Sequence, residues 1–143
     1  MIDPPQRSPR VKVGGLFHFG RMLDKIRAHK CGALPEEYLP NLGLSLGLDG
    51  RLCSFLGIAF TDVCSRVEQG GTDEEILAWC CERSGFQLTE ERAHIWNEYA
   101  RKVGWNDLPG RFLRRVKAED GLADRDDLVT AFEIIDFREG RVK

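Results

Sequence analysis

The stretch from residue 14 to residue 32 most constrains how this chain can fold. On a helical wheel its large apolar side chains fall on one arc, and its charged and imidazole side chains fall on the opposite arc. The apolar arc holds Leu16, Phe19, Met22, Leu23 and Ile26, and the polar arc holds His18, Arg21, Asp24, Lys25 and His29. The pattern predicts an amphipathic helix that ends at Gly32, with one face toward a core.

Helical spacing and capping signals continue along most of the chain. Thr72 followed by Glu75 is a capping box, and Thr89 begins another helix with two acidic residues after it. Asp49 is expected to cap a short helix that ends at Gly57, and Pro109 suits the first turn of a later helix. That later helix should turn Phe112, Leu113 and Val116 inward and Lys117 outward. No alternating run predicts a sheet. The expected fold is all-α, with about six or seven short helices in a single compact domain over residues 1–143.

Two segments are expected to lie outside these helices. A third segment is expected to form the most buried helix. Residues 1–15 contain three prolines and should run extended over the surface. Residues 32–48 are rich in Gly, Pro, Leu and Asn and should form a long loop. Residues 128–137 are apolar around most of a helical circumference, which indicates the most buried helix. The acidic run Asp124, Asp126 and Asp127 just before it suits a helix start.

Composition limits the classes of function. The 143 residues carry a net charge of -2 and a pI of about 5.9, so the overall charge does not favour nucleic acid or membrane as a partner. No apolar run approaches the roughly 20 residues of a membrane-spanning helix, so a soluble protein is expected. Five cysteines, an odd number without a CxxC pair, indicate reduced thiols in a cytoplasm. No metal-ligand or phosphate-loop motif is present, and no metal or cofactor is expected.

Charge is unevenly distributed, and this points to the N-terminal third. Residues 1–30 hold seven Lys and Arg against two Asp, whereas the remainder is acidic. Arg21 and Lys25 on the polar arc could bind a carboxylate or phosphate, with Asp24 orienting Arg21. The alternative is a solvated face or a network of ion pairs to the acidic remainder. In the first case the ligand is a small anion or an acidic protein segment.

Neighbouring side chains extend this candidate binding site. Tyr38 either covers the site as a lid or fills core space. Arg7 and Arg10 either reach the same cleft or anchor the extended segment to acidic groups elsewhere. The rival hypothesis is an enzyme in which His18 and Asp24 act as general acid and base on the same face.

A basic helical face and three tryptophans raise two further possibilities, nucleic-acid binding and oligomer formation. Arg111, Arg114 and Arg115 share one helical face, but the acidic pI makes a solvated face a better interpretation than nucleic-acid binding. A structural protein that works as an oligomer, with a tryptophan at its interface, is the third hypothesis. The candidate tryptophans are Trp79, Trp96 and Trp105. The sequence does not indicate a subunit number.

Several short motifs, taken together, resemble one known family. They are Arg7-Ser8-Pro9-Arg10, Gly14-Gly15, the run from Arg21 to Ala28, Phe55-Leu56-Gly57-Ile58, Ile76-Leu77-Ala78-Trp79 and Asp126-Asp127-Leu128-Val129-Thr130. Across nearly the whole chain they resemble the bacterial domain-of-unknown-function family 5069. The resemblance implies a small bacterial protein, and it implies no established reaction, cofactor or catalytic residue.

Overall fold

Seven α-helices and one 3₁₀ helix follow one another along residues 6–142, the part of the chain that the computed structural model describes. They are α1 (Phe19–Lys30), η1 (Glu36–Asn41), α2 (Leu48–Leu56), α3 (Phe60–Glu68), α4 (Asp73–Ser84), α5 (Glu90–Lys102), α6 (Leu108–Glu119) and α7 (Ala131–Arg138). Within these residues the only β-type pairing is an isolated bridge between Val13 and Leu16. The predicted all-α class and single compact domain are confirmed.

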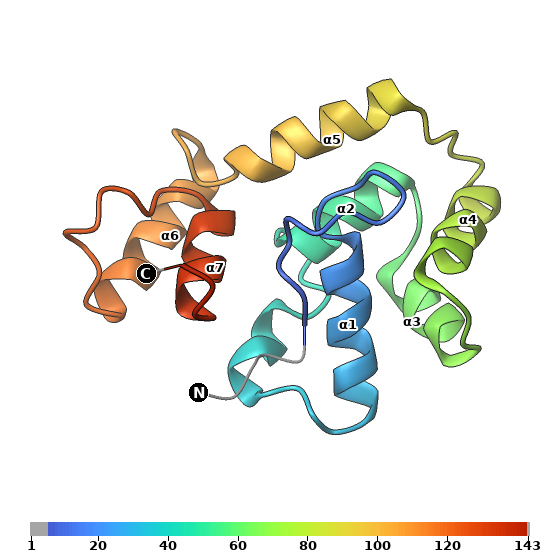
Figure 1. Cartoon of the computed structure of the whole chain (residues 1–143), viewed down its shortest axis with the longest axis horizontal. Helices are drawn as coiled ribbons and strands as arrows, with labels where there is room; N and C mark the ends of the chain where they lie inside the picture. The colour runs from blue at the N-terminus through green and yellow to red at the C-terminus, as the bar shows by residue number, and fades with distance from the viewer. Residues whose placement is uncertain (1–5, 143) are drawn as a thin grey trace.

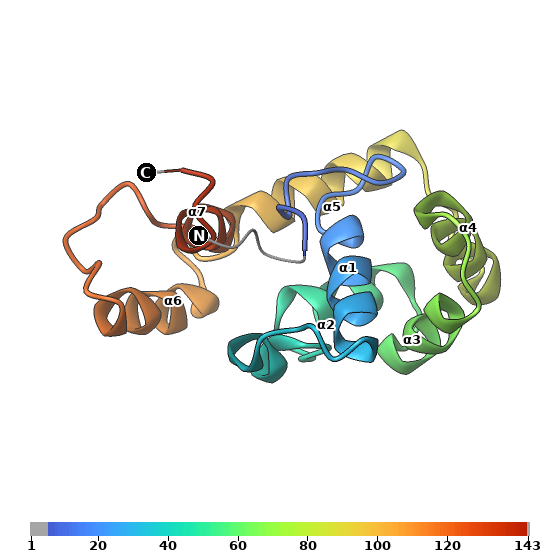
Figure 2. The ribbon, with the colours of Figure 1, turned by 60° about the horizontal axis from the view of Figure 1, so that its bottom comes forward.

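The helices surround α1 on one side of the molecule and form a smaller group on the other. Helices α2, α3 and α4 lie around α1, and α5 runs along the molecule to reach α6 and α7 (Figure 1). The turned view shows the same arrangement, with α6 and α7 at the far end of α5 (Figure 2). Of the predicted extended segment, residues 1–5 lie outside the described residues, and residues 6–15 contain no helix.

The core forms on the apolar arc of α1, as its periodicity predicts. Leu16, Phe19, Met22 and Leu23 are fully buried, and they pack with apolar side chains from α2 to α5. Phe132 brings α7 into this core and meets Phe17 edge to face, with 5.5 Å between ring centroids. Removing this surface from water is the main stabilising contribution, at roughly 25 cal/mol per Å² of apolar area.

Local capping chemistry sets several helix ends where the sequence predicts them. Thr72 and Glu75 form the predicted reciprocal capping box of α4, and Thr89 accepts a hydrogen bond from the Arg92 N–H. Pro109 lies in the first turn of α6. Gly57 ends α2 with a φ of 75°, in the left-handed region that glycine adopts without strain.

Three details of the predicted fold are wrong. Asp49 does not cap α2, because Gly47 is the N-cap and the Asp49 carboxylate turns inward, where buried bases hold it. The most buried helix is α1, with eight of 12 residues buried, against four of eight in α7. In α6, Phe112 was expected inside but is 55% exposed, whereas Lys117 is buried because its Nζ donates to the Arg125 carbonyl at 2.6 Å.

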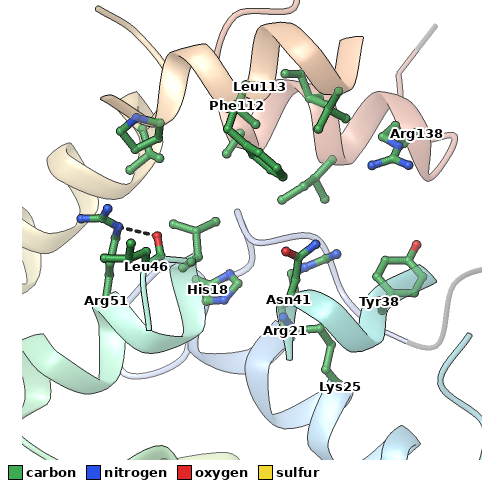
Figure 3. A pocket seen from close by; sticks show the side chains of 18 of the residues that line it. His18, Arg21, Lys25, Tyr38, Asn41, Leu46, Arg51, Phe112, Leu113 and Arg138 are labelled. Carbon is green, nitrogen blue, oxygen red and sulfur yellow. Dashed lines mark hydrogen bonds between the residues drawn. The ribbon is translucent and has the colours of Figure 1, made fainter. Parts of the chain in front are cut away.

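Two further elements differ from the simplest expectation. The long loop between α1 and α2 contains η1, which brings Tyr38 and Asn41 over the end of α1 (Figure 3). Helix α7 begins with a reciprocal capping box of Thr130 and Glu133, three residues beyond the acidic run that was expected to start it. No helix among residues 6–142 has the length and apolar character needed to cross a bilayer.

Candidate functional site

A cavity of about 250 Å³ lies between the two helix groups, and its two walls differ in character (Figure 3). The first wall comes from α1, η1 and α2 and is polar; we call it the polar wall. It includes His18, Arg21, Lys25, Tyr38, Asn41 and Arg51. The second comes mainly from α6 and α7, and we call it the apolar wall. It includes Pro109, Phe112, Leu113, Val116, Ile134 and Ile135. Its one cation among the described residues, Arg138, lies at the edge and pairs with Asp120 at 3.0 Å (Figure 3). Leu46 and Phe112 line the cavity and are well exposed, so the cavity meets solvent beside them.

Behind the polar wall, one buried carboxylate holds two bases, and we call this group the Asp49 cluster (His18, Lys25 and Asp49). The His18 Nε2 lies 2.7 Å from Asp49 Oδ1, and the Lys25 Nζ donates to Asp49 Oδ2 at 2.8 Å. The Gly43 N–H donates to the same Oδ2 at 3.0 Å. All three side chains are 6% exposed or less. Buried charge is tolerated here because it is paired and hydrogen-bonded.

Burial and charge determine the protonation of this cluster. Burial lowers the pKa of His18 to about 4, and the hydrogen bond to Asp49 offsets only part of that effect. Burial opposes ionisation of Asp49, but the hydrogen bond from His18 and the charge of Lys25 outweigh it and hold the pKa of Asp49 below its ordinary value. Around neutral pH, His18 is therefore neutral, while Asp49 and Lys25 form a charge-balanced ion pair.

His18 is unusual in two further respects. Its Nδ1 is buried and has no hydrogen-bond partner among the described residues. Its backbone has a φ of 74°, in the left-handed region that is uncommon for residues other than glycine, although histidine adopts it more often than most, and it precedes the first residue of α1. The His18 N–H donates to the Pro9 carbonyl at 2.7 Å, which helps to hold this conformation. Strain of this kind is more common at functional sites than elsewhere.

The second buried carboxylate beside the cavity is Glu139. Arg21 binds it through two parallel hydrogen bonds of 2.7 Å, and the Tyr38 hydroxyl donates to it at 2.9 Å. Burial and the negative charge of Glu139 raise the pKa of Tyr38 to about 12, so Tyr38 remains a hydrogen-bond donor. Glu139, rather than Asp24, is the carboxylate that orients Arg21. Tyr38 lines the cavity and also links η1 to the end of α7.

Asp24 belongs to a different group on α1, which we call the outer cluster (Arg7, Asp24, Arg27 and Asp73). The Arg7 Nε donates to Asp24 at 2.8 Å, and its Nη2 donates to Asp73 at 2.6 Å. Arg27 also donates to Asp73 at 2.6 Å. These side chains are partly exposed, and none of them lines the cavity. The outer cluster is a satisfied ion-pair network of the kind that the sequence left open as an alternative.

The structure therefore divides the site residues predicted from the sequence. His18, Arg21, Lys25 and Tyr38 come together at the cavity. Asp24 and Arg7 lie in the outer cluster. Arg10 lies elsewhere too, where its Nε donates to Asp136 at 3.1 Å.

Other residues in or behind the cavity walls were not anticipated from the sequence. Asp49 and Glu139 were missed as partners of the basic residues, and so was the whole apolar wall. Arg51 was missed as well. It donates from Nε to the Leu46 carbonyl and from Nη1 to the Tyr99 hydroxyl, both at 2.8 Å. Among residues 6–142 it has no carboxylate partner within ion-pair distance, in contrast to Arg21 and Lys25. The only sequence signal was an aspartate and an arginine in an otherwise apolar short helix.

The three tryptophans have different environments. Trp96 is buried, and its indole N–H donates to the Phe17 carbonyl at 2.9 Å, so it serves the core. Trp79 is partly buried against the core. Trp105 is 62% exposed and lies in the turn before α6. Trp105 is therefore the candidate that remains most available for an interface.

Comparison with known families identifies the chain. Residues 3–141 match the family described as "Domain of unknown function (DUF5069)", and the chain belongs to this family. A comparison with curated proteins found no match. Within residues 6–142, no three His, Cys, Asp or Glu side chains gather in a way that would hold a metal ion.

Proposed function

We propose that this protein is a binding module that holds a small amphipathic anion in the interhelical cavity. The observation that supports the proposal is the pairing of unlike walls, since a polar wall rich in cations faces an apolar wall across one space. Ligand sites commonly combine apolar lining with a few placed polar groups. The cavity is small compared with the roughly 300–1,000 Å³ typical of such sites, which favours a ligand of modest size.

The charges beside the cavity favour an anionic head group near Arg51. Arg21 pairs with Glu139, which also binds Arg141, and Lys25 pairs with Asp49. Arg51 lines the same wall and has no carboxylate partner in the described part of the chain, so a carboxylate or phosphate gains most at this position. The apolar body of the ligand lies against Leu113 and Ile135.

The test is calorimetric titration of the purified protein with octanoate and phenylacetate at low ionic strength. Both acids should bind, and inorganic phosphate should bind more weakly because it has charge but no apolar body. At 100 times its dissociation constant a ligand stabilises the fold by about 2.7 kcal/mol, so melting curves provide a second readout. The proposal fails if the wild-type protein binds neither acid.

Matched variants locate the binding site. Arg51→Gln should weaken octanoate binding about tenfold, whereas Arg115→Gln, an exposed arginine that does not line the cavity, should leave it unchanged. Leu113→Trp should fill the cavity and abolish binding, and Ile95→Trp, at an exposed position on α5, is its control. Equal effects of test and control variants would place the ligand elsewhere.

Acid–base catalysis in the same cavity is a second proposal, and one observation favours it. His18 and Asp49 form a pair in which a carboxylate orients an imidazole, an arrangement found in general-base catalysis. The carboxylate beside His18 is thus Asp49, whereas Asp24 lies in the outer cluster. Burial weakens His18 as a base, which favours binding over catalysis. Turnover of a bound acid, followed by product analysis, would distinguish the two functions.

We also propose a bacterial cytoplasm as the setting. All five cysteines are free thiols, and burial raises the pKa of Cys53 to about 12 and of Cys80 to about 11, which suits packing rather than redox chemistry. The bacterial assignment depends on the family resemblance. An oligomer that uses Trp105, and capture of an acidic protein segment, remain proposals. Sedimentation equilibrium would test the oligomer directly.

A further inference from the structure

The ring of His18 is oriented by Asp49, and this determines which ring nitrogen is free. Asp49 Oδ1 lies 2.7 Å from Nε2, while its Oδ2 already accepts hydrogen bonds from Lys25 and the Gly43 N–H. Because ionised Asp49 only accepts hydrogen bonds, Nε2 must carry the proton. Lys25 balances the charge of Asp49, so a second proton on the imidazole would leave an excess positive charge in a buried position. Nδ1 is therefore a bare acceptor.

This acceptor belongs to a ring that lines the cavity, and no described residue satisfies it. His18 lies on the polar wall between Leu46 and Asn41 (Figure 3). Its ring is 2% exposed, and Nδ1 has no partner among residues 6–142. Buried polar atoms are normally hydrogen-bonded, and an exception calls for an explanation. The left-handed backbone of His18 shows that the fold maintains this orientation despite its conformational strain.

We propose that His18 determines ligand specificity, and that the cavity prefers small amphipathic acids whose apolar body carries a hydroxyl or amide N–H as donor to Nδ1. The inference rests on the proposed function, because it names the class of anion that the same cavity takes. An acid without a donor leaves Nδ1 buried and unpaired, and is bound less tightly for that reason. Sites built to hydrogen-bond a ligand group discriminate strongly against analogues that lack the group.

The first test compares octanoate with hydroxyoctanoates that carry the hydroxyl at the second, third or fourth carbon. In the wild-type protein, at least one hydroxy acid should bind about tenfold more tightly than octanoate. In His18→Phe, which keeps a ring but has no acceptor, this ratio should fall to one. If octanoate and all the hydroxy acids bind the wild type equally, the specificity inference is wrong and the proposed function stands. If none binds, the proposed function fails.

The second test uses the wild-type protein, so it does not depend on whether His18→Phe folds. The chain has three histidines, and His29 and His94 are exposed and do not line the cavity. In protein labelled with ¹⁵N-histidine, saturating hydroxy acid should shift the Nδ1 resonance of His18 in the direction of an accepted hydrogen bond. Octanoate should leave that resonance in place, and His29 and His94 serve as internal references. An unchanged His18 Nδ1 resonance at saturation with the tightest-binding hydroxy acid would overturn the inference.

Discussion

Two charged clusters share α1 and differ in depth and in how fully their hydrogen bonds are satisfied. The outer cluster places Asp24 between two arginines, and its arginine side chains are 35% and 38% exposed. The Asp49 cluster is almost fully buried and leaves one imidazole nitrogen without a partner among residues 6–142. Exposed ion pairs hold segments together at little desolvation cost. Buried polar groups that lack a hydrogen-bond partner are costly, and groups with strongly perturbed pKa values are found most often at functional sites. The comparison favours structure for the outer cluster and ligand recognition for the Asp49 cluster.

The largest expected effect comes from removing the buried carboxylate. Asp49→Ala leaves the Lys25 ammonium buried without its counter-charge, and loss of one partner of a buried pair destabilises a fold by about 3–5 kcal/mol. Urea denaturation should show a loss of that size. Asp124→Ala, at an exposed acidic position, is the control and should change stability by less than about 0.5 kcal/mol. A small effect of Asp49→Ala would mean that water hydrates Lys25 and that the cluster is not buried in solution.

The next effect is a dependence of stability on pH that begins at a higher pH than the one expected from the outer cluster, where the lowered pKa of Asp73 costs stability only near and below its ordinary value of 3.8. The pKa of His18 is about 4 in the folded state and 6.5 ordinarily, so between these values the unfolded chain binds a proton that the folded chain does not. Stability contributed by neutral His18 is present above pH 6.5 and is lost as the pH falls toward 4. The loss is about 1.4 kcal/mol per pH unit and about 3 kcal/mol in total. Urea denaturation at a series of pH values measures it.

His18→Phe provides the comparison for this pH series. Without the imidazole, the variant should lose less stability across the same interval. An equally steep loss in both proteins would show that other groups cause it.

The smallest effect is expected from the outer cluster. Asp24→Ala removes one of the two carboxylates that bind Arg7 but leaves Asp73 to pair with both arginines. The loss of stability should therefore be about 1 kcal/mol. These side chains are partly exposed, and salt at about 0.5 M shortens the electrostatic screening length well below 8 Å. The difference in stability between wild type and variant should therefore shrink at that salt concentration, as measured again by urea denaturation. A loss as large as that of Asp49→Ala would remove the distinction between the clusters.

Local signals in the sequence predicted much of the fold. The apolar arc of α1 identified its buried residues, and the Thr72 capping box marked the start of α4, because both signals act within one or two helical turns. The same reasoning failed for Asp49. At the second position of a short helix an aspartate has the local character of a cap, and only tertiary packing brings it to His18, 31 residues away.

The candidate site was predicted only in part, for the same physical reason. Four cavity residues on or near α1 were identified because their charge or hydrogen-bonding groups stand out in the sequence. The carboxylate that holds Arg21 lies 118 residues further along, and helical periodicity carries no information about such a contact. The apolar wall was missed because Leu113 and Ile135 resemble ordinary core residues in sequence, although in the fold they face a cavity.

The contact between Arg21 and Glu139 also has a consequence for the order of folding. The seven α-helices depend on contacts over a few residues, and such contacts form quickly. Joining α1 to the end of α7 requires closure of a very long loop, whose entropic cost is met only after the intervening helices have packed. We therefore expect the cavity walls to be assembled late in folding, so that ligand binding would report completion of the fold.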